Sequence, residues 1–288
     1  MRYGVIIILS IGSSFIANAQ SFELFGADFN STLNSSNSIG FDNASVTLNL
    51  PLKLKGGLLI QRFSYTANTV KYNSEYFFDT SSIEKFKSIK YSLGFIKKVN
   101  DLWMYSIQIA PTISSNFESS ITFDDVFLNG SLIFIRTNNT SKLRLGLIYN
   151  TGFGMNTPIP VISYSDKITN HLSYTIGMPI TKLNYKLSQF DKVTMYIKPK
   201  GFYSNLSNNI ILNNSLGEVE RVKYRTIESG FNYLHSIDDF WKISMNLGYQ
   251  LYASYNLLNS NDVVYEFDVE NNFFIGVNIK YNLTNKKN

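Results

Sequence analysis

The sequence predicts an all-β protein, a transmembrane antiparallel up-and-down β-barrel of about fourteen strands. Three observations predict this fold. Apolar and polar residues alternate with a period of two in many segments, each about as long as a tilted transmembrane strand. The chain contains 19 tyrosines and 22 phenylalanines, and tyrosine suits the boundary between hydrocarbon and headgroups. After the N-terminal region no apolar stretch is long enough for a spanning helix, so a membrane crossing requires a closed sheet.

The N-terminus has the features of a secretory signal peptide. Arg2 supplies a positive charge, residues 5–16 are mostly apolar, and Ala17 and Ala19 form a small-x-small cleavage site before Gln20. The apolar run is shorter than the roughly 20 residues that a membrane anchor needs. We therefore expect this segment to be cleaved rather than retained as an anchor.

One domain is expected to follow the signal. Residues 1–19 are predicted to be the signal peptide and residues 20–288 an outer-membrane β-barrel domain. The chain has no cysteine, which excludes disulfides, thiol nucleophiles and thiolate metal sites. Its formal net charge is +5, but the basic residues are scattered rather than clustered, so we expect no nucleic-acid partner. No cofactor is expected either.

Fourteen segments carry strand signals. The alternation is clearest near the C-terminus, where Ile275, Val277 and Ile279 lie on one face and Asn278 and Lys280 on the other. An amphipathic helix would need apolar residues at three- and four-residue spacing, which these segments lack. In chain order, the expected strands are 22–30, 43–54, 57–66, 86–98, 102–113, 125–136, 142–152, 158–165, 170–178, 180–188, 192–202, 219–233, 240–254 and 272–283.

The connections between these segments alternate in length. If the cleaved N-terminus lies in the periplasm, every second connection should be a short turn and the others longer external loops. The expected short turns are 55–56, 99–101, 137–141, 166–169, 189–191 and 234–239. The longest gaps, 67–85, 203–218 and 255–271, all fall on the external side. A soluble sandwich has no reason to sort its connections in this way.

One connection is unusually tight. Only Pro179 separates the segments 170–178 and 180–188. Reading both as one long strand would give thirteen strands and would break the alternation of turns and loops. Fourteen strands is therefore the prediction, with twelve as the alternative if a neighbouring pair is too short to span.

The C-terminal strand also contains a short assembly motif. Gly276, Ile279 and Tyr281 place a glycine before apolar residues at alternate positions. This pattern resembles the C-terminal signal by which the barrel-assembly machinery recognises its clients. It departs from the common form because it ends with Leu283 and a polar tail rather than with a terminal phenylalanine.

A longer resemblance covers roughly the C-terminal half of the chain. The segments 158–164, 172–179, 201–206 and 224–230, together with Tyr185, resemble a family of uncharacterised outer-membrane β-barrel proteins of the Bacteroidetes group, a domain of unknown function. The resemblance implies a barrel in the bacterial outer membrane, with lipid and the barrel-assembly machinery as partners. The family has no assigned activity, so the resemblance transfers no functional residue.

The histidines give little support to catalysis. A hydrolase like the outer-membrane phospholipases would need a histidine beside a hydroxyl nucleophile, near the outer leaflet. His171 and His235 are the only histidines, and both fall in or beside predicted periplasmic turns. Without cysteine, two histidines so far apart also lack the ligand spacing of a zinc site. We therefore expect no catalytic and no metal-binding residues.

Charged residues inside the strands are more informative. A charge that faces lipid at the bilayer midplane costs about 2–4 kcal/mol, so such residues should face the lumen or rise above the membrane. They could hold a plugged lumen together or form a basic constriction that favours anions. The candidate lumen charges are Arg144, Arg221, Lys223, Arg225, Glu228, Lys242 and Lys280.

The leading functional hypothesis is a small passive, porin-like channel of the outer membrane. The alternative is a non-conducting structural or adhesin-like barrel, whose loops 67–85 and 255–271 contact ligands or neighbouring cells through exposed aromatic residues. An outer-membrane hydrolase is a distant third.

Overall fold

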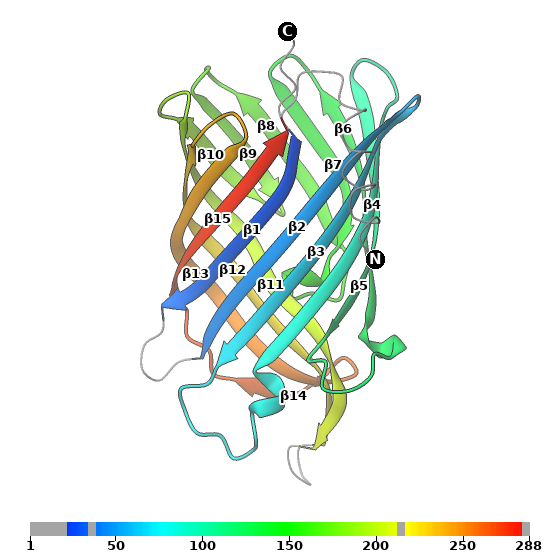
Figure 1. Cartoon of the computed structure of the whole chain (residues 1–288), viewed down its shortest axis with the longest axis vertical. Helices are drawn as coiled ribbons and strands as arrows, with labels where there is room; N and C mark the ends of the chain where they lie inside the picture. The colour runs from blue at the N-terminus through cyan, green and yellow to red at the C-terminus, as the bar shows by residue number, and fades with distance from the viewer. Residues whose placement is uncertain (1–21, 34–38, 212–216, 284–288) are drawn as a thin grey trace, which may run out of the picture.

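The computed structural model describes residues 22–33, 39–211 and 217–283. The predicted cleavage site at Ala17, Ala19 and Gln20 lies outside these residues. The described chain forms one antiparallel sheet that closes on itself (Figure 1). Its strands are β1 (Phe22–Leu33), β2 (Gly40–Leu54), β3 (Gly57–Lys71), β4 (Lys85–Lys98), β5 (Trp103–Ser115), β6 (Val126–Thr137), β7 (Ser141–Tyr149), β8 (Ile159–Lys167), β9 (Leu172–Met178), β10 (Thr181–Lys186), β11 (Asp191–Ile211), β12 (Glu218–Ser236), β13 (Trp241–Asn259), β14 (Asp262–Phe267) and β15 (Phe273–Leu283).

The described residues also form three single 3-10 turns, namely η2 (Ser81–Ile83), η3 (Phe123–Asp125) and η4 (Thr151–Phe153). In the part of the chain that the structure describes, no helix has the length and apolar character needed to cross a bilayer.

The first and last strands close the barrel. β1 pairs antiparallel with β15 from Phe22↔Leu283 to Leu33↔Phe273. The other edge of β15 pairs with β13, and β13 pairs with β12. Only β14 lies outside this ring, because it pairs with β13 alone. The barrel therefore has fourteen strands, as the sequence predicts, and no open edge faces the lipid.

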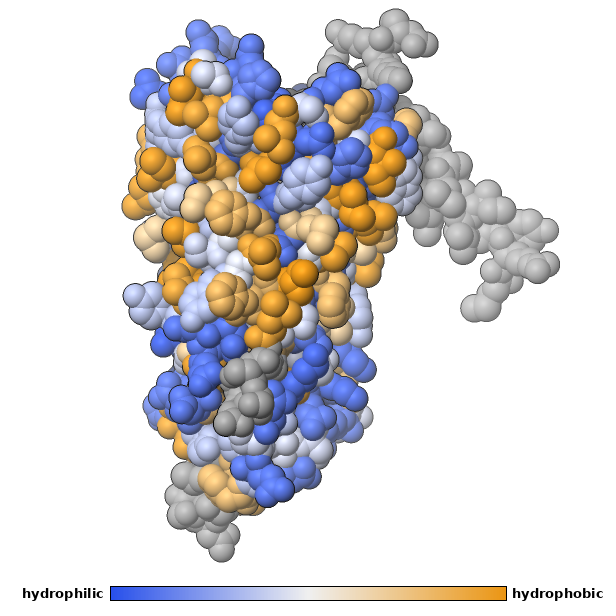
Figure 2. Space-filling model, turned by 90° about the vertical axis from the view of Figure 1, so that its left-hand side faces the viewer, coloured by the Kyte–Doolittle hydropathy of each residue, from blue (hydrophilic) through white to orange (hydrophobic). Residues whose placement is uncertain are grey.

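Alternation along each strand separates an inner face from an outer face. In β15, Phe274 and Asn278 point inward and are buried, whereas Phe273 and Val277 point outward and are exposed. Outward positions on other strands are also apolar and highly exposed, for example Leu128 at 66%. Figure 2 shows hydrophobic residues gathered in a broad belt on one face, with hydrophilic residues toward both ends of the molecule. Such an exposed apolar belt is what a bilayer covers.

The two ends of the barrel differ. At one end, uppermost in Figure 1, all connections are short turns, such as Lys55-Gly56 between β2 and β3. We call this the short-turn end. The opposite end, which carries β14 and the longer loops, is called the long-loop end. The six short turns lie within a few residues of the predicted positions.

The long loops are partly strand, which corrects the prediction. β3 continues to Lys71, β11 to Ile211 and β13 to Asn259, and β14 occupies part of the gap 255–271. The predicted strands cover only about the length that crosses a membrane. These strands continue beyond it because they pack around a buried apolar core at the long-loop end.

The tight connection between β9 and β10 is a hairpin of Pro179 and Ile180. Gly177 precedes it with φ of +130°, a conformation that residues with a Cβ rarely adopt. A Cβ there would also lie 2.0 Å from the backbone oxygen of Ile162. The Thr181 hydroxyl donates a hydrogen bond to the Gly177 carbonyl (3.0 Å). The chain can therefore reverse with so few residues, and fourteen rather than thirteen strands result.

β11 bends at the long-loop end and meets β5, a strand that is not its neighbour in the ring. A single parallel bridge joins Asn205 to Ser115. Beside it, the hydroxyls of Ser114 and Ser204 lie 3.0 Å apart. This contact passes over the ends of the shorter strands β6 to β10, so the barrel narrows toward the long-loop end.

Candidate functional site

The inner face of the barrel carries many more cations than carboxylates. Among the described residues, the inward carboxylates at the level of the apolar belt are Glu23, Asp28 and Glu228. The inward cations at that level are Arg62, Lys90, Arg144, Lys182, Lys192, Lys198, Lys200, Lys242 and Lys280. Among the predicted lumen charges, Arg144, Glu228, Lys242 and Lys280 thus lie on the inner face.

The other three predicted lumen charges do not lie on the inner face but beyond the belt, which is the second of the two positions that the sequence analysis allows for them. Along β12 the inward residues Val222 and Glu228 are fully buried, and Arg221, Lys223 and Arg225 occupy the alternate positions. That outward row continues into the exposed apolar belt at Phe231, which is 53% exposed. The three cations lie past the belt, toward the long-loop end, where Arg221 Nη1 donates to the Ser260 carbonyl oxygen (3.3 Å). Height along the strand, rather than facing, therefore avoids the cost of burial in lipid.

Two of the inward carboxylates form ion pairs. Glu228 is fully buried and lies between two lysines of the adjacent strand, with Lys198 Nζ at 3.3 Å and Lys200 Nζ at 3.1 Å. Glu23 pairs with Lys280 (2.6 Å) across the seam between β1 and β15. Glu228 therefore neutralises only one of its two lysines, and the lumen keeps an excess of positive charge.

A cluster of lysines without carboxylate partners lies toward the short-turn end. The charges that act on Lys192 are those of Lys182, Lys186, Lys242 and Lys280. Of these five lysines, only Lys280 has an ion pair among the described residues. Cations that repel one another in this way require water or anions around them, since a dry core would not tolerate them. We call Lys182, Lys192 and Lys242 the lysine cluster.

The long-loop end is closed by a compact apolar core. The rings of Phe41 and Tyr224 stack at 3.7 Å between centroids, and Tyr255 is fully buried beside them. Tyr72, from the loop after β3, packs against Phe267 of β14. Burial raises the pKa of the Tyr72 phenol far above its ordinary value, and the neighbouring Tyr255 adds to this shift. We call this core, with its rings of Phe41, Tyr72, Phe202, Tyr224, Tyr255 and Phe267, the aromatic plug.

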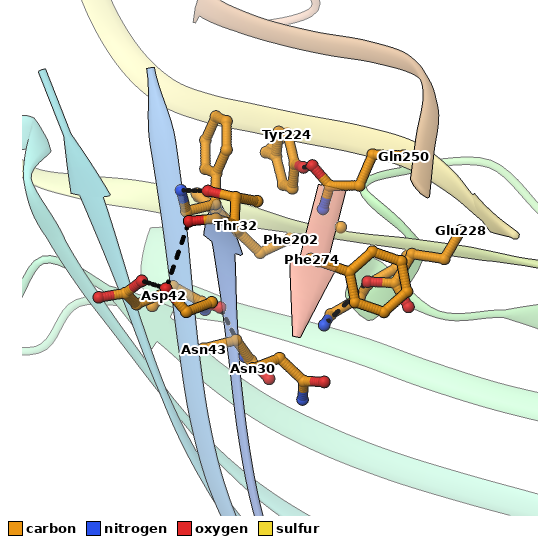
Figure 3. A pocket seen from close by; sticks show the side chains of 14 residues that line it. Asn30, Thr32, Asp42, Asn43, Phe202, Tyr224, Glu228, Gln250 and Phe274 are labelled. Carbon is orange, nitrogen blue, oxygen red and sulfur yellow. Dashed lines mark hydrogen bonds and ion pairs between the residues drawn. The ribbon is translucent and has the colours of Figure 1, made fainter. Parts of the chain in front are cut away.

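The floor of the plug is where apolar and charged side chains meet. Figure 3 shows Phe202, Tyr224 and Phe274 together with Gln250 and Glu228 around a small cavity. The Tyr224 hydroxyl donates to Gln250 Oε1 (3.1 Å). This hydrogen bond joins β12 to β13, and the ion pair between Glu228 and Lys200 joins β12 to β11, so the base of the plug is connected across three strands.

The histidines lie at the short-turn end, as the sequence predicts. His235 Nδ1 lies 2.8 Å from Asp191 Oδ1, and His171 Nδ1 lies 3.1 Å from the Lys186 carbonyl oxygen. Ser188 donates its hydroxyl to Asp191 Oδ2 (2.6 Å). This serine contacts the carboxylate rather than an imidazole, so the arrangement lacks the nucleophile–base contact of a serine hydrolase.

The residues of the proposed assembly motif lie at the closing seam. Gly276 points inward, where an added Cβ would collide with the Asn30 side chain. Ile279 and Tyr281 point outward, and the Tyr281 ring lies 5.0 Å from that of Trp241. Their role in recognition by the assembly machinery stays a prediction.

Sequence reasoning missed several inward cations and the aromatic plug. Arg62 and Lys90 lie on the polar faces of two strands that the alternation predicts, so the same parity identifies them as inward residues. The plug left no comparable signal. Phe41, Tyr72 and Tyr255 are far apart in sequence and meet only because the barrel closes.

Comparison with known proteins identifies the family. The chain matches the family described as "Domain of unknown function (DUF6268)" over residues 30–282, and it therefore belongs to that family. A search of curated proteins finds no match.

Among solved structures, the chain is similar to an outer membrane channel from Pseudomonas putida F1 (9% identity, TM-score 0.48, covering 94% of this chain and 98% of that one). It is also similar to the Pseudomonas putida toluene transporter TodX (8% identity, TM-score 0.44, covering 95% of this chain and 92% of that one). A third similar structure is the KdgM porin in complex with disordered oligogalacturonate (8% identity, TM-score 0.38, covering 89% of this chain and 98% of that one). At these levels of similarity, the function has to be argued from the geometry of this chain.

Proposed function

We propose that this member of the DUF6268 family is a small passive channel of the bacterial outer membrane, closed at its long-loop end in the present state. The observation that supports this most is the lysine cluster on the inner face. Removing an unpaired ammonium group from water costs several kcal/mol. The lysine cluster therefore indicates that the lumen holds water, which a channel requires.

The orientation follows from the loops. In outer-membrane barrels the short turns lie in the periplasm and the long loops outside. With that orientation the lysine cluster opens to the periplasm, and the aromatic plug closes the external mouth. Outer-membrane lipid would cover the apolar belt, and the barrel-assembly machinery would read Gly276, Ile279 and Tyr281. Origin in the Bacteroidetes group is part of the same proposal.

The plug determines how the channel would work. Tyr255 is fully buried in the described structure, and its neighbours come from strands and loops on opposite sides of the mouth. Solutes therefore cannot pass through these rings without displacing them. Conduction requires the plug to open, by movement of the loop that carries Tyr72 or of the hairpin formed by β13 and β14.

Planar-bilayer recordings test this proposal. We expect brief, rare conductance steps from the wild type and longer openings from Tyr255→Ser, because the smaller side chain leaves the plug underpacked. Correct assembly of each variant is checked by the heat-modifiable mobility of unboiled protein. Silence of both proteins, when both are fully assembled, would contradict the proposal.

A second candidate function is a non-conducting barrel that binds surfaces through its long-loop end. Phe77 is 61% exposed there and makes edge contacts with Phe78 and Tyr265. Exposed rings at a loop tip favour contact with another molecule. If bilayers stay silent while Phe77→Ser abolishes attachment of cells that display the barrel, this second function is the correct one.

A further inference from the structure

Two cavities lie inside the barrel between the aromatic plug and the lysine cluster. One has a volume of about 200 Å³ and is lined by Arg62, Lys90 and Asn150 among others. The second has a volume of about 250 Å³ and extends toward Lys200 and the base of the plug. Ser64 and Lys90 line both cavities, so the two spaces adjoin each other.

Two cations without carboxylate partners line this region. Arg62 donates from Nε to Asn49 Oδ1 (2.5 Å), and Lys90 Nζ donates to Asn150 Oδ1 (3.3 Å). Both acceptors are neutral amides, and neither cation has an ion pair among the described residues. The charge of Arg62 acts directly on Lys90. Two neighbouring cations with only neutral partners leave positive charge uncompensated, and an anionic ligand would neutralise it.

Hydroxyl and amide groups complete the walls. On β2 to β4, inward positions hold a row of hydroxyl side chains, including those of Thr47, Ser64 and Ser88. On β6, the Asn129 amide nitrogen donates to the hydroxyls of Thr112 and Thr151 (2.7 and 3.1 Å), so the amide is fixed in orientation. Short hydroxyl side chains both donate and accept hydrogen bonds, which suits a ligand that carries several hydroxyl groups.

We propose that this region, built around Arg62 and Lys90, binds a small polyhydroxylated anion such as a sugar acid or a phosphorylated sugar. Each cavity is smaller than the roughly 300–1,000 Å³ typical of drug-sized ligands, so the ligand has about the size of a monosaccharide. The site extends the proposed function because solute must enter the lumen, but binding itself does not require conduction.

Isothermal titration calorimetry on the purified full-length barrel in detergent micelles tests this site, with D-glucuronate as the probe. We expect saturable binding that weakens as salt is added, because screening reduces attraction between exposed charges. Arg62→Gln and Lys90→Gln should each weaken binding about tenfold, since each removes a charge-assisted hydrogen bond. Lys87→Gln is the matched control, because Lys87 lies on the same strand as Lys90 but faces outward. It should bind as the wild type does.

Other probes separate the parts of the proposal. D-glucose should bind much more weakly than glucuronate, and inorganic sulfate should bind but less tightly. No glucuronate binding to assembled wild type, equal binding of glucose, or equal weakening by Lys87→Gln would overturn the site. Sulfate as tight as glucuronate would overturn the role of the hydroxyl groups. If glucuronate binds but planar bilayers show no conductance, the binding site stands and the channel is rejected. If bilayers conduct but glucuronate does not bind, the channel stands and the binding site is rejected.

Discussion

The phenol oxygens of Tyr72 and Tyr255 lie 2.9 Å apart, although 183 positions separate the two residues in the chain. Tyr72 also donates to the Ile83 carbonyl oxygen (3.0 Å), so η2 is part of the same contact. This pair joins the loop after β3 to the extended end of β13. It lies at the centre of the aromatic plug, and the predictions about closure follow from it.

Tyr255→Ser should destabilise the long-loop end strongly. Truncation of a fully buried aromatic side chain costs about 3–5 kcal/mol, whereas loss of one hydrogen bond costs about 1 kcal/mol. Tyr255→Phe, which removes only the hydroxyl, should therefore stay near wild type. Limited proteolysis of the loop 72–80 measures the difference, with rapid cleavage expected for Tyr255→Ser alone. Equal cleavage of both variants would show that packing of this ring does not hold the plug.

Alkaline pH should open the plug. The pKa of Tyr72 in the folded protein is raised above the ordinary value of 10.0, mainly by burial. The neutral phenol therefore stabilises the closed state below pH 10, and this contribution is lost as the pH rises above 10, where an exposed phenol would ionise. Open probability in bilayers should rise above pH 10 in the wild type. In Tyr72→Phe, the pH at which the open probability rises should differ from that of the wild type. If the open probability depends on pH identically in both proteins, ionisation of Tyr72 does not cause the rise.

Ion selectivity should depend on which face of the barrel wall a charge lies on, and not on the charge alone. Lys192→Glu changes a charge of the lysine cluster and should shift the reversal potential in a salt gradient toward cation preference. Arg221→Glu makes the same charge change on the outer face of β12, and it should leave the reversal potential unchanged. If Arg221→Glu shifts selectivity as much as Lys192→Glu, the assignment of inner and outer faces on β12 is wrong.

Gly154→Ala should disturb the turn that covers the ends of the short strands. Gly154 has φ of +65°, and an added Cβ would lie 1.8 Å from the Tyr224 backbone oxygen. The left-handed conformation and the collision both oppose a side chain. We expect a lower unfolding temperature in a thermal scan of unboiled mobility. Gly56→Ala, where nothing lies within 4 Å, is the control and should be neutral.

The alternation along the strands made most of the barrel predictable. In β15 every second residue from Phe273 onward faces lipid, and a shift by one residue would reverse all of them. That constraint fixed the strand count and the inward direction of Lys242 and Lys280. The alternation could not predict where a strand leaves the membrane. Val222 and Arg225 alternate in the same way as residues inside the membrane, so the pattern gives their faces but not their height along the barrel.

The plug and the lumen cavities could not be predicted, because they depend on contacts across the barrel. Phe41 and Tyr224 come from strands that are not neighbours in sequence, and their stacking follows from closure and bending of the sheet. Likewise, Lys90 and Asn150 are 60 positions apart, and their hydrogen bond forms only in the folded barrel. Periodicity predicts on which side of its strand a residue lies, but not which residue of another strand it contacts.

Accessibility of the inner face tests the central claim most directly. Because the chain has no cysteine, single thiols can be placed on one strand, with Ser173→Cys inward and Ile176→Cys outward on β9. In proteoliposomes, an anionic methanethiosulfonate reagent should modify the inward thiol quickly, and faster than a cationic reagent of similar size does. The outward thiol should stay unmodified in lipid. Failure of the inward thiol to react, or equal reaction of the two positions, would contradict a water-filled cationic lumen.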